Sequence, residues 1–168
     1  TASQQRGGGR GQRGDRPQGG SPYPLETKRS PAIGHRGVVA TSQPLASLAG
    51  LDILKKGGNA IDAAIATAAV LTVVEPQSTS LGGDMFAMVY LAEEDTLVGL
   101  NGSGRAAYGM TPEALKNRLD DQELQRIPGI YSVTVPGAVD GWFTLHERYG
   151  TLSMAEVLEP AIYYAEHG

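Results

Sequence analysis

GGNAIDAAIATAAVLTVVEPQSTSLGGDMF, residues 57–86, is the stretch that decides how this chain folds. Gly57-Gly58 is typical of the end of a helix, and Asn59 with Asp62 three residues later has the spacing of a capping box. Residues 60–74 are rich in alanine and apolar on nearly every side. We therefore expect a helix at 60–74 that is buried between two layers.

The second half of this stretch predicts a loop, a tight turn and a strand. Pro76 ends the helix, and residues 81–84 form a turn into the apolar run 85–91. The pair Gly82-Gly83 permits positive φ angles, so it allows a ligand or another backbone to approach the main chain. A simple bend at a sheet edge is the equally weighted alternative.

Helical and strand patterns alternate on both sides of this stretch. Upstream, we expect a strand at 38–40 and a helix that starts at Ser42 and runs to Lys55-Lys56, with Pro44 in its first turn. Downstream, we expect a return strand at 96–100, helices at 112–119 and 138–148, a strand at 131–135 and a last helix from Ser153. The apolar stripe of that last helix predicts a continuation beyond residue 168.

Composition excludes several classes of protein. A length of 168 residues with 40% hydrophobic side chains supports one ordinary core, and the absence of cysteine excludes disulfides and thiolate chemistry. The longest apolar stretch is shorter than the ~20 residues that cross a bilayer, so we expect no membrane span. No apolar leader is visible, which favours the cytoplasm, with periplasmic or secreted protein as the alternative.

Charge divides the chain into two parts. Residues 1–36 carry seven basic and two acidic side chains among many glycines, and residues 37–168 carry seven basic and 16 acidic ones. We expect 1–36 to be a disordered Gly/Arg-rich tail and linker, and 37–168 to be the folded part. The tail is a short leader or, less favoured, an RNA-binding arm, whereas the acidic body is unsuited to nucleic acid.

Candidate site residues lie in the loop Asn101-Gly102-Ser103-Gly104-Arg105, which follows a predicted strand. Arg105 can bind a carboxylate or phosphate with two hydrogen bonds, or it is an ordinary surface arginine. The three histidines are far apart and no nucleotide-binding glycine motif occurs, so we expect no metal and no cofactor. No catalytic constellation can be placed in this chain.

Four linked segments resemble the γ-glutamyltransferase family in order and spacing: 56–64, 74–76, 81–86 and 135–142. The resemblance runs from about Gly37 to Gly168. It implies an N-terminal-nucleophile hydrolase, an α+β fold of the αββα sandwich type, of which this chain is the N-terminal portion of the large subunit. It also implies a precursor that cleaves itself before a threonine, and that threonine lies outside this chain.

The implied activity is hydrolysis or transfer of a γ-glutamyl or related acyl group from an amide, through an acyl-threonine. The implied partners are the rest of the large subunit, the threonine-headed small subunit and a small amide substrate. The fragment alone is expected to be inactive. The rival hypothesis is a non-catalytic homologue that kept the scaffold and binds nucleic acid through its Arg/Gly-rich tail.

In this family an arginine in a pattern like N-x-R-E-x-A-P binds the α-carboxylate of the γ-glutamyl group. Aligned without gaps on the following alanine, Ser103 occupies the place of that arginine and Arg105 falls two residues later. This form resembles the branch with cephalosporin or glutaryl acylases. The resemblance therefore implies Arg105, and secondarily Ser103, as substrate-binding residues and leaves the acyl group open.

Overall fold

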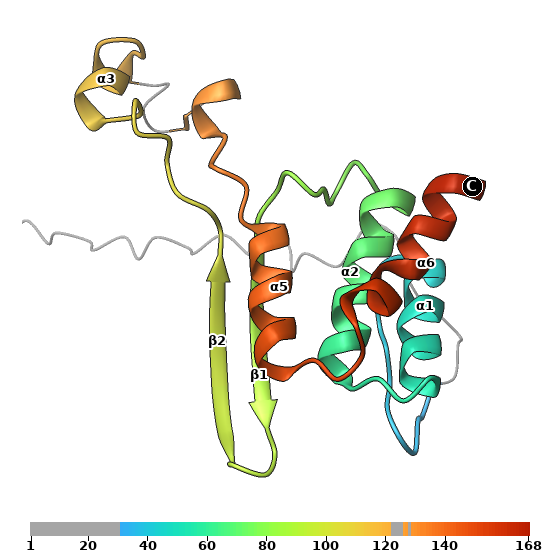
Figure 1. The fold of residues 1–168 in the computed structure, drawn as a ribbon. Helices are drawn as coiled ribbons and strands as arrows, with labels where there is room; N and C mark the ends of the chain where they lie inside the picture. Colours follow the sequence, from blue (N-terminus) through green and yellow to red (C-terminus); the bar gives the residue numbers. More distant parts are fainter. Residues whose placement is uncertain (1–30, 122–125, 128) are drawn as a thin grey trace, which may run out of the picture. The chain divides into compact units, whose positions relative to one another are not determined.

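The computed structural model describes residues 31–121, 126–127 and 129–168, and the folded unit is Gly34–Gly168. The tail predicted at 1–36 lies almost wholly outside the described residues. The elements, in chain order, are α1 (Pro44–Lys55), α2 (Ala60–Val74), β1 (Met85–Leu91), β2 (Thr96–Gly102), α3 (Pro112–Lys116), a 3₁₀ turn (Gly129–Ser132), α5 (Ala138–Tyr149) and α6 (Met154–His167) (Figure 1).

α1 and α2 are joined by the glycine turn that the sequence predicts. Gly57 has φ +97°, its N–H donates to the Leu54 carbonyl, and the Gly58 N–H donates to the Ile53 carbonyl. This pair of bonds is the Schellman motif, which satisfies the last carbonyls of a helix. A side chain at Gly58 would meet Ile53 and Leu152, so this glycine lets two elements approach closely.

The capping box of α2 is confirmed. The Asn59 side chain accepts from the N–H groups of Ile61 and Asp62, and an Asp62 carboxylate oxygen accepts from the Asn59 N–H. The same carboxylate accepts from Thr151 and Leu152, which lie between α5 and α6. Asp62 therefore ties the start of α2 to a distant part of the chain.

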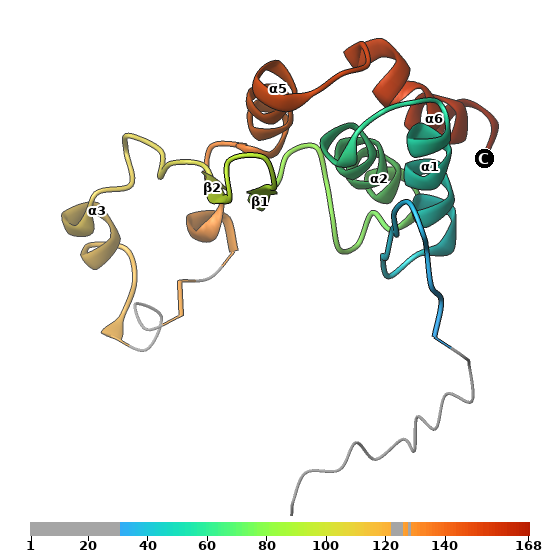
Figure 2. The same ribbon diagram turned by 90° about the horizontal axis from the view of Figure 1, so that it is seen from below.

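β1 and β2 form an antiparallel hairpin with Met85 opposite Gly102 and Leu91 opposite Thr96. Alternate residues of the hairpin, such as Ala87 and Val89, pack against a core that includes Trp142 of α5 and Ile65 of α2. α5 lies over one face of the hairpin, as the two views show (Figures 1 and 2).

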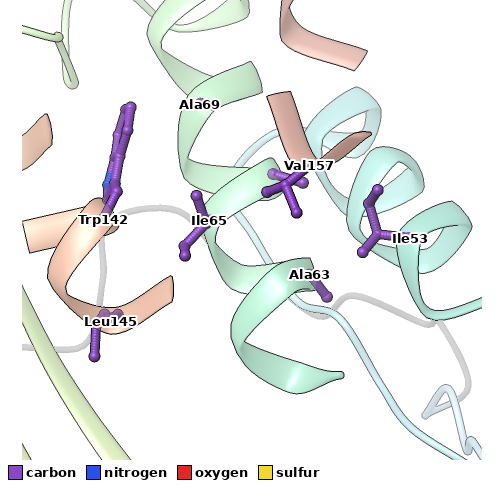
Figure 3. Packing of buried hydrophobic residues seen from close by; sticks show 8 residues of the cluster. Ile53, Ala63, Ile65, Ala69, Trp142, Leu145 and Val157 are labelled. Atoms are coloured by element: carbon purple, nitrogen blue, oxygen red, sulfur yellow. The ribbon is translucent and has the colours of Figure 1, made fainter. Parts of the chain in front are cut away.

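α2 is the centre of the helical core. α1 and α6 both pack against it, and α5 contacts it from the hairpin side. Ile53 and Val157 lie on one side of α2 and Trp142 and Leu145 on the other (Figure 3). This confirms the prediction that 60–74 is buried between layers.

Two local predictions are wrong. Residues 38–40 are not a strand, because the sheet of the described residues has only β1 and β2, and Val39 packs toward Gly50 instead. Residues 131–135 form the end of a 3₁₀ turn and an irregular segment, and Pro136, which follows them, has no N–H for a ladder. The predicted helix start near Ser42 is confirmed: α1 begins at Pro44 with Gln43 as its cap, and the Ser42 hydroxyl donates to Glu75.

Candidate functional site

A groove opens where β2 ends and α5 begins, with a volume of about 810 Å³. Both residues that the sequence singled out, Ser103 and Arg105, line it. The other lining residues come from the same loop, from the segment before α5 and from its first turn: Asn101, Gly102, Gly104, Ala106, Tyr108, Val135, Pro136, Gly137 and Asp140.

The loop that carries Ser103 and Arg105 is packed directly on the segment before α5. Gly104 has φ +76°, and a Cβ at this position would lie 1.9 Å from the Val135 carbonyl oxygen. Only glycine therefore fits both the backbone conformation and the space. The Val135 N–H donates to the Arg105 carbonyl at 2.8 Å.

The start of α5 rests on the glycine turn at residues 82–84. The Gly83 carbonyl accepts from the N–H groups of Gly137 at 3.1 Å and Ala138 at 3.0 Å. The neighbouring Asp84 carboxylate accepts from the Thr134 hydroxyl at 3.0 Å. Of the two hypotheses for Gly82-Gly83, the structure supports the simple bend: neither glycine has a positive φ, a Cβ at Gly82 would meet nothing within 4 Å, and one at Gly83 would meet only Ser80 of the same turn.

Arg105 offers an exposed guanidinium to the groove. It has no ion-pair partner within the part of the chain that the structure describes. The Ser103 side chain is half-buried, and its backbone N–H donates to the Asn101 side chain at 3.0 Å. The groove thus presents an unpaired cation beside a hydroxyl, which suits binding of a carboxylate.

Sequence reasoning missed Asp140 and Tyr108 as groove residues. Asp140 is in the first turn of α5, where an acidic residue is favourable in any helix, so its type carried no functional signal. The sequence offered one signal, which is that Asp140 lies in the segment 135–142. In the structure, the start of this segment faces the loop at 101–105. Tyr108 lies six residues after β2, and no periodicity connects it to the groove.

The described residues contain no group of three or more His, Cys, Asp or Glu side chains arranged to hold a metal ion. Within the same residues, none of the helices has both the length and the apolar character needed to cross a membrane.

Comparison with known proteins shows the family. The family model described as gamma-glutamyltranspeptidase matches residues 46–168. The chain is 45% identical to the glutathione hydrolase-like YwrD proenzyme of Bacillus subtilis (strain 168), over 81% of this chain and 25% of that protein. It is 42% identical to the acylase ACY 1 proenzyme of Pseudomonas sp. (strain SE83), over 84% of this chain and 26% of that protein.

Solved structures of related proteins support the same family. The crystal structure of cephalosporin acylase from Bacillus halodurans matches with a TM-score of 0.70 and 52% identity, over 86% of this chain and 28% of that one. Helicobacter pylori gamma-glutamyltranspeptidase matches with a TM-score of 0.72 and 35% identity, over 83% of this chain and 40% of that one.

The chain belongs to the gamma-glutamyltranspeptidase family. The predicted resemblance to this family is confirmed. The predicted fold class, a portion of the N-terminal-nucleophile hydrolase sandwich, is confirmed as well. The chain spans about a quarter of the length of the curated relatives it matches. The relatives named above include proteins described as proenzymes.

Proposed function

We propose that the complete protein is an amide-acyl hydrolase or transferase of the γ-glutamyltransferase type, and that this chain supplies the residues that hold the acyl group. The observation that carries the proposal is the position of Arg105, an unpaired cation that lines a groove with Ser103 in a member of this family. Its partners are the rest of the large subunit and a small subunit headed by a threonine.

In the proposed reaction, the threonine hydroxyl attacks the amide carbonyl of the substrate and forms an ester with the acyl group. The α-amine of the same threonine takes the hydroxyl proton and returns it to the leaving amine. Water or an amino acceptor then attacks the ester and releases the acyl group. The nucleophile lies outside this chain, so residues of this chain orient the substrate and do not react.

Arg105 would bind a carboxylate at the far end of the acyl group, with Ser103 as a second hydrogen-bond donor. Asp140 adds a negative charge to the same groove. A γ-glutamyl group carries an ammonium beside its carboxylate, whereas a glutaryl group carries the carboxylate alone. Comparing γ-glutamyl and glutaryl substrates therefore measures how strongly Asp140 affects the choice of acyl group.

The first test is expression of the complete gene product. We expect two bands on a denaturing gel, because the precursor cleaves itself, and hydrolysis of γ-glutamyl or glutaryl anilides. A single uncleaved band without hydrolysis would contradict the proposal and favour a non-catalytic scaffold.

The second test is Arg105→Ala in the complete enzyme. Loss of a bidentate charged contact should lower kcat/KM for carboxylate-bearing substrates by about 10- to 100-fold. Arg105→Lys should recover only part, since an ammonium cannot make the paired contact. Arg118→Ala, at an exposed arginine outside the groove, is the control. An unchanged kcat/KM in Arg105→Ala for every carboxylate-bearing substrate would remove the role of Arg105.

A further inference from the structure

We infer that Asp84 and Thr134 are positioning residues for Arg105: their hydrogen bond fixes the segment on which the substrate-binding loop is built. This inference rests on the proposed function, because it assigns a role toward the same carboxylate. It also assigns a role to Asp84, which lies in the segment 81–86 and was not predicted as a site residue.

The first link is between the glycine turn and the segment 134–138. The Thr134 hydroxyl donates to the Asp84 carboxylate at 3.0 Å, although the two residues are 50 positions apart in the chain. Four residues later, the Ala138 N–H donates to the Gly83 carbonyl at 3.0 Å. The turn at 83–84 therefore holds the segment at both of its ends.

The second link is between that segment and the loop. The Val135 N–H, next to Thr134, donates to the carbonyl of Arg105 itself. At Gly104, a Cβ would fall 1.9 Å from the Val135 carbonyl oxygen and 3.1 Å from the Thr134 hydroxyl. A Cβ at Gly137 would fall 2.3 Å from the Gly102 carbonyl oxygen. The two backbones are thus in direct contact along residues 102–105 and 134–137.

The guanidinium of Arg105 has no partner of its own to orient it among the described residues. The backbone at Arg105 therefore fixes only the point from which its side chain reaches into the groove, and a bidentate contact to a carboxylate tolerates little displacement of that point. The bond between Asp84 and Thr134 is exposed. Such a bond contributes little to folding, so its loss should affect the geometry of the loop more than the stability of the protein.

The test uses the complete self-cleaved enzyme with two variants that break the bond, Asp84→Ala and Thr134→Val, and two that retain it, Asp84→Asn and Thr134→Ser. Asparagine still accepts and serine still donates. KM and kcat are measured with glutaryl and γ-glutamyl anilides, and with a glutaryl anilide whose terminal carboxylate is replaced by a carboxamide.

We expect Asp84→Ala and Thr134→Val to raise KM for the carboxylate-bearing anilides by about 5- to 20-fold and to change KM for the carboxamide by less than about twofold. Asp84→Asn and Thr134→Ser should restore most of the loss. Ser132→Ala is the matched control. Ser132 lies two residues before Thr134, and the hydrogen bond that its hydroxyl makes within the described residues goes to the Gly129 carbonyl and not to the loop.

Either of two results in the single variants would overturn the inference while leaving the proposed function intact. One is an equal loss for all substrates with a lowered Tm, which indicates a purely structural role. The other is a carboxylate-specific loss in Arg105→Ala with none in Thr134→Val. The double variant Arg105→Ala/Thr134→Val should be no worse than Arg105→Ala alone, and full additivity would also contradict the inference. If Arg105→Ala itself affects no substrate, the role of Arg105 in the proposed function fails.

Discussion

At the scale of single residues, Asp62 is the carboxylate that the fold uses most heavily. Its side chain is completely buried, and it accepts hydrogen bonds from Asn59, Thr151 and Leu152. Burial alone would raise its pKa, but the hydrogen bonds from the Thr151 hydroxyl and from the three backbone N–H groups outweigh burial and lower the pKa. The ionised form is therefore the one that the native state requires.

This lowered pKa predicts a pH-dependent contribution to stability. A carboxyl whose pKa is lower in the folded state stabilises it above the ordinary value of 3.8, and this contribution is lost as the pH falls through the folded pKa. Asp62→Asn places an amide among N–H donors, so we expect it to cost about 2–4 kcal/mol of unfolding free energy near pH 6. Urea unfolding of the wild type and Asp62→Asn at pH 6 and pH 3 measures this difference in unfolding free energy.

The difference between the wild type and Asp62→Asn should shrink at pH 3, because below its ordinary pKa of 3.8 the carboxyl of the unfolded chain takes up a proton and the lowered pKa of the folded state then contributes less stability. Asp52→Asn is the matched control: Asp52 is exposed and pairs with Lys55 at 3.0 Å, so its loss should cost less than about 0.5 kcal/mol. A difference that stays constant between the two pH values would show that the charge of Asp62 does not matter.

At the scale of elements, glycines decide how the helices join. Gly57 has a positive φ with open space around it, whereas Gly58 has no positive φ but lies against Ile53 and Leu152. Gly57→Ala should therefore cost about 1 kcal/mol through backbone strain alone. Gly58→Ala should cost about 1–3 kcal/mol, because a Cβ would lie 2.7 Å from the buried Ile53 side chain.

Chemical denaturation of the two variants measures the two costs. Gly82→Ala is the control, since a Cβ there has nothing within 4 Å and the residue has no positive φ. We expect its unfolding free energy to match that of the wild type. Equal costs for Gly57→Ala and Gly58→Ala would be compatible with the ranges above, but a neutral Gly58→Ala would contradict the close packing at this turn.

The sequence predicted these elements well where a local signal existed. The Schellman turn, the capping box at Asn59 and Asp62, the strand at 85–91 and the capping serine of α6, Ser153, each depend on residues within a few positions of one another. The strand predicted at 131–135 failed for a non-local reason. Its residues bond to the loop at Arg105 and to Asp84, neither of which the local pattern reveals.

The site was predictable only in part, for the same reason. Ser103 and Arg105 were found because they follow a strand and because the family places a substrate-binding arginine nearby. Asp140 was not found, because nothing in the sequence shows that α5 begins beside that loop. Hydrogen bonds from Gly137 and Ala138 to Gly83 create this neighbourhood, and they join segments more than 50 residues apart.

At the scale of the whole unit, the outer face of the hairpin is apolar and uncovered within the described residues. Phe86, Met88, Tyr90 and Leu97 are 69%, 77%, 61% and 59% exposed, although their neighbours Ala87 and Val89 pack on the core. Contiguous apolar surface of this kind marks an interaction surface or promotes aggregation. In the part of the chain that the structure describes, each strand is also paired on one side only.

The 168-residue chain expressed by itself should therefore self-associate and bind a hydrophobic dye. Met88→Lys with Leu97→Thr should reduce both, without changing the helical circular dichroism signal, because neither side chain contributes to the core. Val89→Lys is the contrasting variant, since its side chain packs on the core and its change should unfold the chain. A wild-type chain that stays monomeric in sedimentation velocity at high concentration would contradict this prediction.

The hydrogen bonds of Asp62 also determine the order in which parts of the fold can form. Thr151 is 89 residues further along the chain, so the ribosome has to synthesise that whole stretch before the carboxylate finds its partners. Until then α2 has only the local half of its cap, and closing so long a loop is slow compared with forming a helix. The link between α2 and residues 151–152 should thus form late, as α5 and α6 dock, and hydrogen exchange during refolding should protect the N–H groups of Thr151 and Leu152 after those of α2.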